Sequence, residues 1–112
     1  MNWNKLSDIT QLDEIVKTSS MKPVLIFKHS TRCSISSTAL DRLERSWKSA
    51  EVRGLEPYYL DLIQFRDISG AIESTFDVEH QSPQVLVIKN GRCVYKASHY
   101  DIRYQELLKH LS

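Results

Sequence analysis

The hydrophobic positions of this chain form short continuous runs that alternate with stretches in which they recur every three or four residues. The first type of run predicts buried strands, and the second predicts amphipathic helices. Leu12, Ile15 and Val16 fall on one face of a predicted first helix. Residues 24–27 are continuously apolar, as in a strand covered on both faces, so we expect them at the centre of a sheet.

Two further helices and another strand follow. From Ser34 to about Ser49 the apolar side chains recur every four residues, which lines one side of a helix and leaves its charged residues to solvent. Residues 55–60 predict a second strand. Residues 68–76 predict a third helix.

An Asn-Gly dipeptide between two β-type runs gives the clearest turn signal in the chain. It predicts that residues 84–89 pair with residues 92–97 as an antiparallel hairpin. An amphipathic pattern over residues 100–111 predicts a closing helix.

The predicted order is therefore helix, strand, helix, strand, helix, strand, strand, helix. Parallel strands joined by helical crossovers and followed by a hairpin give an α/β fold, with a mixed sheet of about four strands and helices on both faces. We expect one domain, residues 1–112, because this length suffices for one core and shows no repeat or linker. Functional sites of such sheets lie at the carboxyl ends of the parallel strands.

The composition narrows the range of partners. The chain has 15 Lys and Arg residues against 14 Asp and Glu residues, a net charge of +1, with both signs mixed along the sequence. This balance argues against nucleic acid or an anionic membrane as a partner. With no apolar run near the roughly 20 residues that span a bilayer, and no secretion signal, we expect a cytoplasmic protein.

Cys33 lies where the first predicted strand gives way to the helix that begins near Ser34. Unsatisfied N–H groups and the positive end of the helix dipole favour a thiolate there, and the thiolate is the nucleophilic form of cysteine. Ser36 stands three residues on, where a dithiol oxidoreductase carries its second cysteine. The pattern predicts a redox site with one cysteine; the alternative is a buried cysteine that only packs.

The arrangement of a buried strand, a cysteine opening the next helix and an X-Pro pair opening a later strand resembles thioredoxin-fold proteins over nearly the whole chain. Thioredoxins carry Trp-Cys-Gly-Pro-Cys at the place of residues 32–36, and their cis-proline segment matches Gln-Ser-Pro-Gln at residues 81–84. Within that superfamily, Thr-Arg-Cys-Ser-Ile-Ser at residues 31–36 is most similar to the Thr-x-Cys-x-Ile-Ser signature of the monothiol bacilliredoxins (YtxJ type).

This resemblance implies a thiol-disulfide oxidoreductase that removes bacillithiol from S-bacillithiolated cytoplasmic proteins. Cys33 is then the nucleophile and Ser36 its catalytic neighbour. Bacillithiol is a co-substrate, no cofactor is bound, and a low-molecular-weight thiol clears the adduct. The residues expected to contact the substrate are Thr31, Arg32, Ser34, Ser82 and Pro83.

Two positions depart from related patterns. Ser34 stands where much of the family carries proline, which leaves the first helical turn less rigid and adds an N–H near the sulfur. Phe27 replaces the proton-relaying aspartate of thioredoxins, which has no task when position 36 is serine.

Two side chains near Cys33 have both a functional and a structural interpretation. Ser36 can donate its hydroxyl to the Cys33 sulfur, since residues three apart share a helix face, or it can satisfy backbone groups of the first turn. A cis bond before Pro83 would turn the Ser82 backbone toward the thiol to pair with an extended substrate; a trans proline that opens a strand is the alternative.

A basic lining would help to recognise the malate-type group of bacillithiol. Arg32 is the first candidate because a guanidinium pairs bidentately with a carboxylate, and Lys28 and His29 are next; the alternative for each is a solvated surface charge. The four histidines show no zinc-ligand spacing with the cysteines, so we predict no metal.

The second cysteine, Cys93, is a poor partner for Cys33. The resemblance places Pro83 beside Cys33, and the strand after it runs away at about 3.3 Å per residue, so Cys93 begins near the opposite end of the sheet. A disulfide needs Cα atoms within about 7 Å. We expect a packing role for Cys93, with an intermolecular or rearranged disulfide as the alternative.

Two other functions remain open at this level. One is iron–sulfur cluster transport, because monothiol glutaredoxins carry Cys-Gly-Phe-Ser; residues 33–36 share the Cys and the Ser but neither the Gly nor the Phe. The other is a thioredoxin-like docking domain without redox turnover.

Overall fold

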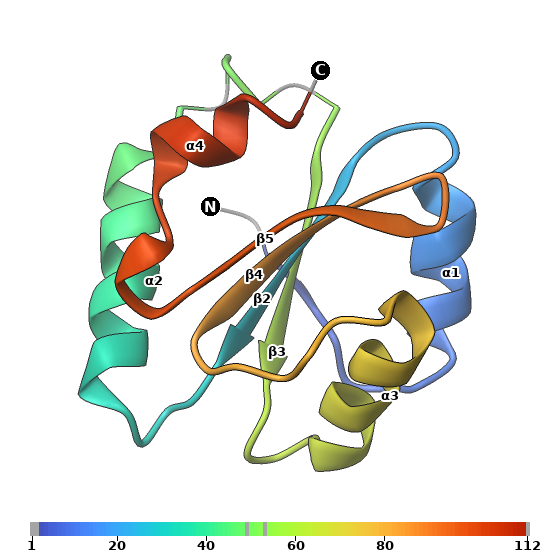
Figure 1. Cartoon of the computed structure of the whole chain (residues 1–112), viewed down its shortest axis with the longest axis horizontal. Coiled ribbons are helices and arrows are strands. Elements are labelled where there is room, and N and C mark those ends of the chain that lie inside the picture. Colours follow the sequence, from blue (N-terminus) through green and yellow to red (C-terminus); the bar gives the residue numbers. More distant parts are fainter. Residues whose placement is uncertain (1–2, 49, 53, 112) are drawn as a thin grey trace.

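The protein is built on a five-stranded mixed sheet with strand order β1-β3-β2-β4-β5 (Figure 1). The computed structural model describes residues 3–48, 50–52 and 54–111. The elements are β1 (Asn4–Lys5), α1 (Gln11–Thr18), β2 (Val24–His29), α2 (Ser34–Ser46), β3 (Glu56–Asp61), α3 (Arg66–Phe76), β4 (Gln84–Lys89), β5 (Arg92–Ser98), a 3₁₀ helix (His99–Asp101) and α4 (Tyr104–Leu108).

The strand β2 is central, and all six of its residues are buried. It pairs in parallel with β3, where His29 lies opposite Asp61, and antiparallel with β4, where Lys28 lies opposite Gln84. The carboxyl ends of β2 and β3 and the amino end of β4 therefore meet at one edge of the sheet. This edge, which we call the active edge, carries the segment that contains Cys33.

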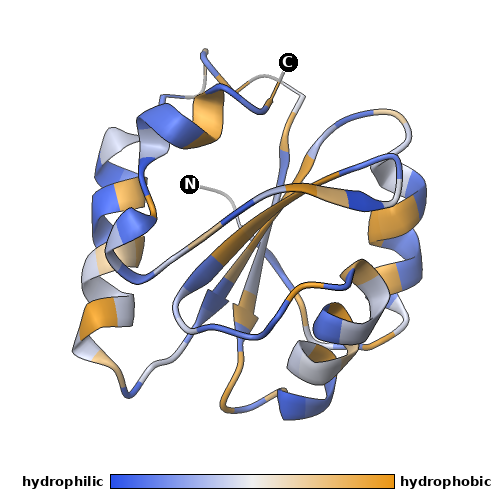
Figure 2. Cartoon of the chain, in the orientation of Figure 1, coloured by the Kyte–Doolittle hydropathy of each residue, from blue (hydrophilic) through white to orange (hydrophobic). Residues whose placement is uncertain are grey.

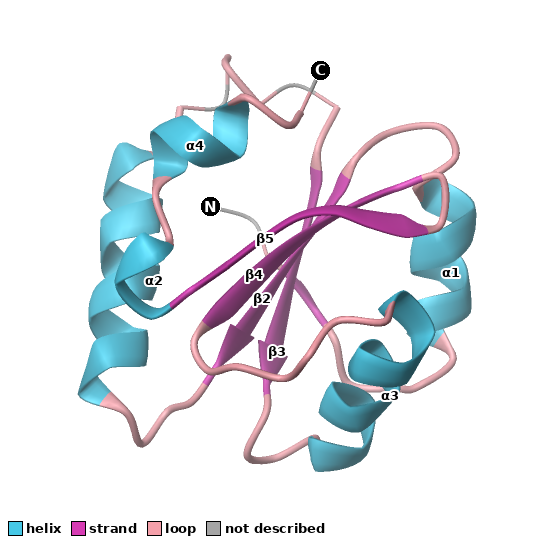
Figure 3. Cartoon of the chain, in the orientation of Figure 1, coloured by secondary structure: helices cyan, strands magenta, loops and turns pink. Residues whose placement is uncertain are grey.

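Helices cover both faces of the sheet, with α2 and α4 on one side and α1 and α3 on the other (Figures 1 and 3). Alternate residues of β2 divide between two hydrophobic cores, Val24 and Ile26 facing α1 and α3, and Leu25 and Phe27 facing α2 and α4. Figure 2 shows the apolar residues gathered along the central strands. Among the helices in the described ranges, none is long and apolar enough to cross a membrane.

Most element ends differ from the prediction by one or two residues, and three differences are larger. The two-residue β1, which pairs with β3, has no strand pattern of its own; it brings Leu6 into the core. The helix α2 ends at Ser46, and the predicted end at Ser49 lies outside the described residues. The prediction of one helix over residues 100–111 is wrong, because Arg103 has an extended backbone and separates the 3₁₀ helix from α4. This break allows both Ile102 and Tyr104, on either side of Arg103, to be buried.

The predicted hairpin turn forms at Asn90 and Gly91, which have φ values of 52° and 74°. Gly91→Ala is expected to lower the free energy of unfolding by about 1 kcal/mol, because a side chain strains this left-handed backbone. A Cβ there would make an ordinary van der Waals contact with Cγ1 of Val16 at 3.5 Å, so the cost comes from the backbone conformation. Urea denaturation measures the change.

Gly70→Ala is the matched control for this prediction. Gly70 lies within α3, and a Cβ there meets nothing within 4 Å. Because alanine is the better helix former, the free energy of unfolding should rise by about 0.5–1 kcal/mol. A loss at both glycines would contradict the explanation by backbone conformation.

Candidate active site at the start of α2

Cys33 is the residue immediately before α2, with extended backbone angles (φ −113°, ψ 120°). Its N–H donates to the Ser30 carbonyl at 3.2 Å, and its carbonyl accepts the Ser37 N–H at 3.1 Å. This geometry fixes the cysteine at the N-terminus of the helix, at the active edge of the sheet.

The Cys33 thiol is free and partly exposed. Its neighbours Thr31, Arg32 and Ser34 are exposed. A sulfur with access to solvent, surrounded by one cationic and two hydroxyl side chains, is open to a substrate disulfide. The position therefore suits nucleophilic exchange better than packing.

Ser36 lies beneath this surface and is fully buried, with 0% of its area exposed. Its Oγ is 2.7 Å from Nδ1 of His29 and accepts the Ser30 N–H at 3.0 Å. The two bonds reach back to the last residue of β2 and to the first residue of the loop that leads to Cys33. Ser36 thus ties the first turn of α2 to the loop that carries the cysteine.

His29 is the last residue of β2 and is only 5% exposed. Its ring lies 5.6 Å from that of Tyr59 and 6.3 Å from that of Phe27, between ring centroids. Burial lowers the pKa of His29, although Asp61 and Glu44 act in the opposite direction. The imidazole is therefore neutral at pH 7.

The segment before β4 completes the active edge. The Ser82–Pro83 peptide bond is cis, Pro83 is buried, and its carbonyl accepts the His99 N–H at 3.0 Å. The Ser82 hydroxyl oxygen is buried without a hydrogen-bond partner within the described part of the chain. Since Gln84 pairs with Lys28, this segment ends beside the carboxyl end of β2, which lies four residues before Cys33.

Of the three basic residues considered as an anion lining, only Arg32 lies at the surface. Lys28 is fully buried, and its Nζ donates to Nδ1 of His80 at 2.7 Å. Burial lowers the pKa of Lys28 to about 8, against an opposing effect of Glu73. Lys28 and His29 therefore point to opposite faces of the sheet, and both side chains are buried rather than exposed beside Cys33.

Cys93 lies far from this site along the sheet. It pairs with Ile88, which pairs with Val24 at the start of β2, whereas Cys33 follows the end of that strand. The Cys93 thiol is free and half-buried, and it donates to the Tyr95 carbonyl at 3.2 Å. Burial raises the pKa of this thiol, so it is the less suited of the two to nucleophilic attack.

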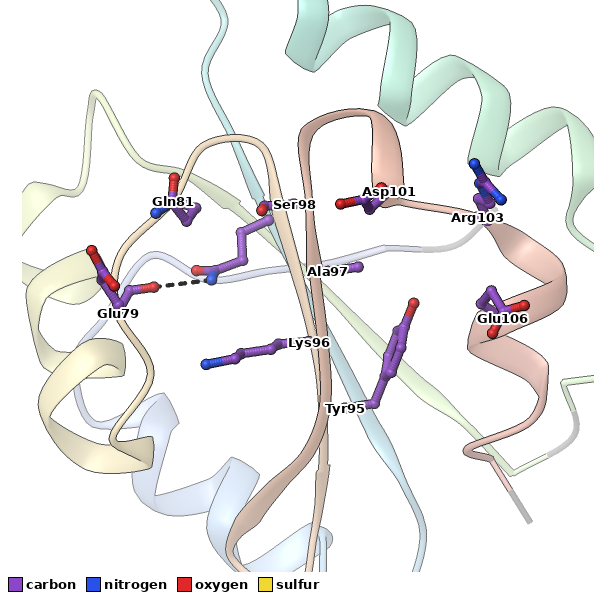
Figure 4. Close-up of a pocket in the computed structure, with 10 residues that line it drawn as sticks. Glu79, Gln81, Tyr95, Lys96, Ala97, Ser98, Asp101, Arg103 and Glu106 are labelled. Atoms are coloured by element: carbon purple, nitrogen blue, oxygen red, sulfur yellow. Dashed lines mark hydrogen bonds between the residues drawn. The ribbon is translucent and has the colours of Figure 1, made fainter.

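A pocket of about 480 Å³ flanks the segment before β4 (Figure 4). It is lined by residues of the 79–84 segment, of β5 and of 101–106, and Gln84 closes one side through a 3.0 Å bond from its Nε2 to the Glu79 carbonyl. The pocket lies beside the active edge rather than over Cys33. No three His, Cys, Asp or Glu side chains in the described ranges form a group that could hold a metal ion.

The His29–Ser36 and Lys28–His80 pairs are features that sequence reasoning missed. A lysine and a histidine at the end of an apolar run suggest exposure, whereas the strand pairing on both sides of β2 buries them. The alternation of side chains along β2 was the available signal, because it sends the two in opposite directions.

When the chain is compared with known protein families, one family model matches it. A family model described as "Monothiol bacilliredoxin BrxC" matches residues 4–107. A solved structure provisionally described as an oxidoreductase with a thioredoxin fold is 35% identical, covering 94% of this chain and 89% of that chain with a TM-score of 0.78. The α/β architecture described above is thus shared with that structure.

Two thioredoxins share the fold at low identity. The thioredoxin of Malassezia sympodialis is 16% identical, with 96% of this chain and 86% of that chain covered and a TM-score of 0.74. Oxidized mitochondrial thioredoxin 3 of Saccharomyces cerevisiae is 17% identical, with 97% and 92% covered and a TM-score of 0.72. The chain therefore has the thioredoxin fold.

Proposed function

The chain belongs to the monothiol bacilliredoxin family, and we propose that it removes bacillithiol from S-bacillithiolated proteins in the cytoplasm. Family and fold support thiol-disulfide redox chemistry in general. Bacillithiol as the substrate is proposed from the family alone. The observation that carries the one-cysteine mechanism is a free, partly exposed Cys33 at the start of α2, with a buried serine at the position of a second thiol. Such a site performs exchange with one cysteine.

In the proposed reaction, the Cys33 thiolate attacks the bacillithiol sulfur of the substrate mixed disulfide. A bond forms between Cys33 and bacillithiol, the substrate disulfide breaks, and the substrate sulfur leaves as a thiolate that takes up a proton. A second low-molecular-weight thiol then attacks the adduct at the bacillithiol sulfur, which frees Cys33 and leaves the two small thiols joined by a disulfide.

The side chains around the sulfur have proposed roles in recognition. Arg32 is exposed and cationic, so it is suited to pair with the carboxylates of bacillithiol, and the hydroxyls of Thr31 and Ser34 lie on either side in sequence. We assign the Ser82–Pro83 segment to binding of the protein substrate's backbone, because it leads directly into β4 at the same edge of the sheet as Cys33.

Intact-mass spectrometry after mixing with a bacillithiolated model protein tests the proposal. Wild type and Cys93→Ala should each gain one bacillithiol as the model protein is freed, and Cys33→Ala should gain none. Cys93→Ala is the matched control because it removes the other thiol of the chain. A glutathionylated model protein is treated in parallel.

Three outcomes would contradict the proposal. Absence of any adduct on wild type would exclude the exchange reaction. An adduct retained by Cys33→Ala would move the nucleophile to Cys93. Transfer of glutathione without transfer of bacillithiol would keep the exchange chemistry and overturn the assigned substrate.

A further inference from the structure

We propose that His29 is a positioning residue for Cys33 and acts through Ser36. Its imidazole holds the Ser36 hydroxyl in the interior and thereby keeps this hydroxyl from stabilising the Cys33 thiolate. The inference rests on the proposed function only in taking Cys33 as the nucleophile. It extends that function by naming a residue that controls the reactivity of the Cys33 thiol.

The hydrogen bonds of Ser36 carry the argument. The oxygen is bound on one side by the Ser30 N–H at 3.0 Å and on the other by Nδ1 of His29 at 2.7 Å. We take the imidazole as the neutral tautomer with its proton on Nε2, in which Nδ1 accepts the Ser36 hydroxyl proton while the Ser30 N–H occupies a lone pair of the oxygen. In the other tautomer the hydroxyl proton would be free to reach the sulfur. Ser36 is thus held away from the surface by a partner that is itself buried.

His29 has little freedom to release this hydroxyl. It is 5% exposed, its backbone belongs to the central strand, and the rings of Phe27 and Tyr59 lie against its imidazole. A fixed and neutral ring in this position is a permanent hydrogen-bond partner. The restraint on Ser36 therefore belongs to the folded state and needs no ligand.

Cys33 is the neighbour that a released Ser36 hydroxyl would meet. The two residues are three apart at the start of α2, so they share a helix face with roughly 5–6 Å between Cβ atoms. A hydroxyl that donates to a thiolate favours the ionised form. Nucleophilicity falls as a thiolate is stabilised, so a restrained Ser36 keeps the sulfur reactive in exchange.

The pH profile of Cys33 alkylation by iodoacetamide tests this inference in a Cys93→Ala background, where only one thiol reacts. His29→Phe removes the polar partner and keeps a ring among the aromatic neighbours. Its profile should move to lower pH by about half to one unit. The rate on the acidic side should rise only about twofold to fourfold, because the lower nucleophilicity of the stabilised thiolate offsets about half of the logarithmic gain in thiolate fraction. His29→Leu, which is smaller and equally apolar, carries the same expectation if the phenyl ring prevents folding.

Two further variants separate positioning from a general loss of structure. His29→Asn places an amide atom near the position of Nδ1, so it should restore the parent profile. In the double variant His29→Phe with Ser36→Ala, the profile should equal that of Ser36→Ala alone, because the effect passes through the hydroxyl.

An unchanged profile in folded His29→Phe would overturn the inference. An equal shift in the Ser36→Ala background would overturn it as well, since His29 would then act without Ser36. Alkylation needs no bacillithiol, so these results do not depend on the outcome of the transfer experiment. A failed transfer experiment would leave the alkylation profiles to be judged on their own.

Discussion

Lys28→Met is expected to raise the free energy of unfolding by about 2 kcal/mol at pH 7. Lys28 is fully buried on the central strand, and burial lowers its pKa from 10.5 to about 8. Keeping the ammonium charged in that environment costs about 3 kcal/mol relative to the unfolded chain. Loss of the bond to His80 offsets about 1 kcal/mol of the gain, and the flexible methionine side chain can occupy the same space.

The gain should depend on pH in a defined direction. Between pH 8 and pH 10.5 the folded protein has released the Lys28 proton while the unfolded chain still holds it. The unfolded state then binds more protons, so the stability of wild type rises with pH across this window. The methionine variant lacks this rise, and its advantage should shrink toward zero near pH 10.5.

Lys22→Met is the matched control, since Lys22 is partly exposed and pairs with Glu56 at 2.6 Å. Its effect should be a loss of about 0–1 kcal/mol. Chemical denaturation at pH 7 and pH 10 measures both variants. Two results would contradict the explanation that the buried Lys28 charge destabilises the fold. One is a lower free energy of unfolding for Lys28→Met than for wild type at pH 7, and the other is a stability gain of the same size at pH 10 as at pH 7.

Why wild type retains such a lysine follows from its neighbours. His80, which receives the Lys28 bond, lies two residues before Ser82 in the segment that leads to Pro83. Ser69 of α3 also lies 3.3 Å from Nδ1 of His80. The buried pair therefore links the central strand and α3 to the segment assigned to substrate binding. The buried Lys28 therefore lowers the free energy of unfolding but helps to hold the segment before β4 in place at the active edge.

The sequence predicted the parts of the fold that local patterns determine. The Asn90-Gly91 turn requires positive φ values, which these two residue types tolerate, and the hairpin formed there as expected. Cys33 was likewise placed correctly before α2, because a strand pattern ended and a helix pattern began around it. Both features depend on residues that are adjacent in the chain.

Features that depend on distant contacts were not predictable in the same way. The strand β1 exists because Asn4 and Lys5 pair with β3, more than fifty residues later. The burial of Lys28 and His29 depends on pairing with β3 and β4 on either side. A polar residue in an apolar run was open to both interpretations until the neighbouring strands were known.

Ser36→Cys is expected to change the end product of the reaction almost completely. In wild type the reaction should stop with one bacillithiol on Cys33 until a second small thiol arrives. An introduced thiol one turn along α2 can instead attack the Cys33 sulfur, so a disulfide forms within the chain and bacillithiol leaves as a thiolate. Residues three apart on a helix lie within the 4.4–6.8 Å Cα separation that a disulfide requires.

The surroundings of Ser36 favour this internal step. Because the position is fully buried, the introduced thiol would have little access to free bacillithiol and would react with its neighbour. Nδ1 of His29, 2.7 Å from the present hydroxyl oxygen, is placed to accept the thiol proton. Intramolecular attack of this kind proceeds at a high effective concentration.

Intact mass distinguishes the two products, an adduct with one added bacillithiol and a chain that has lost two hydrogens. Thr38→Cys is the control, because this exposed residue is five positions from Cys33 and faces another side of α2. It should retain the adduct. If Ser36→Cys also retains the adduct on Cys33, the two positions do not approach within bonding distance. That result would weaken the inference that His29 keeps Ser36 from the sulfur, because the inference requires the same proximity.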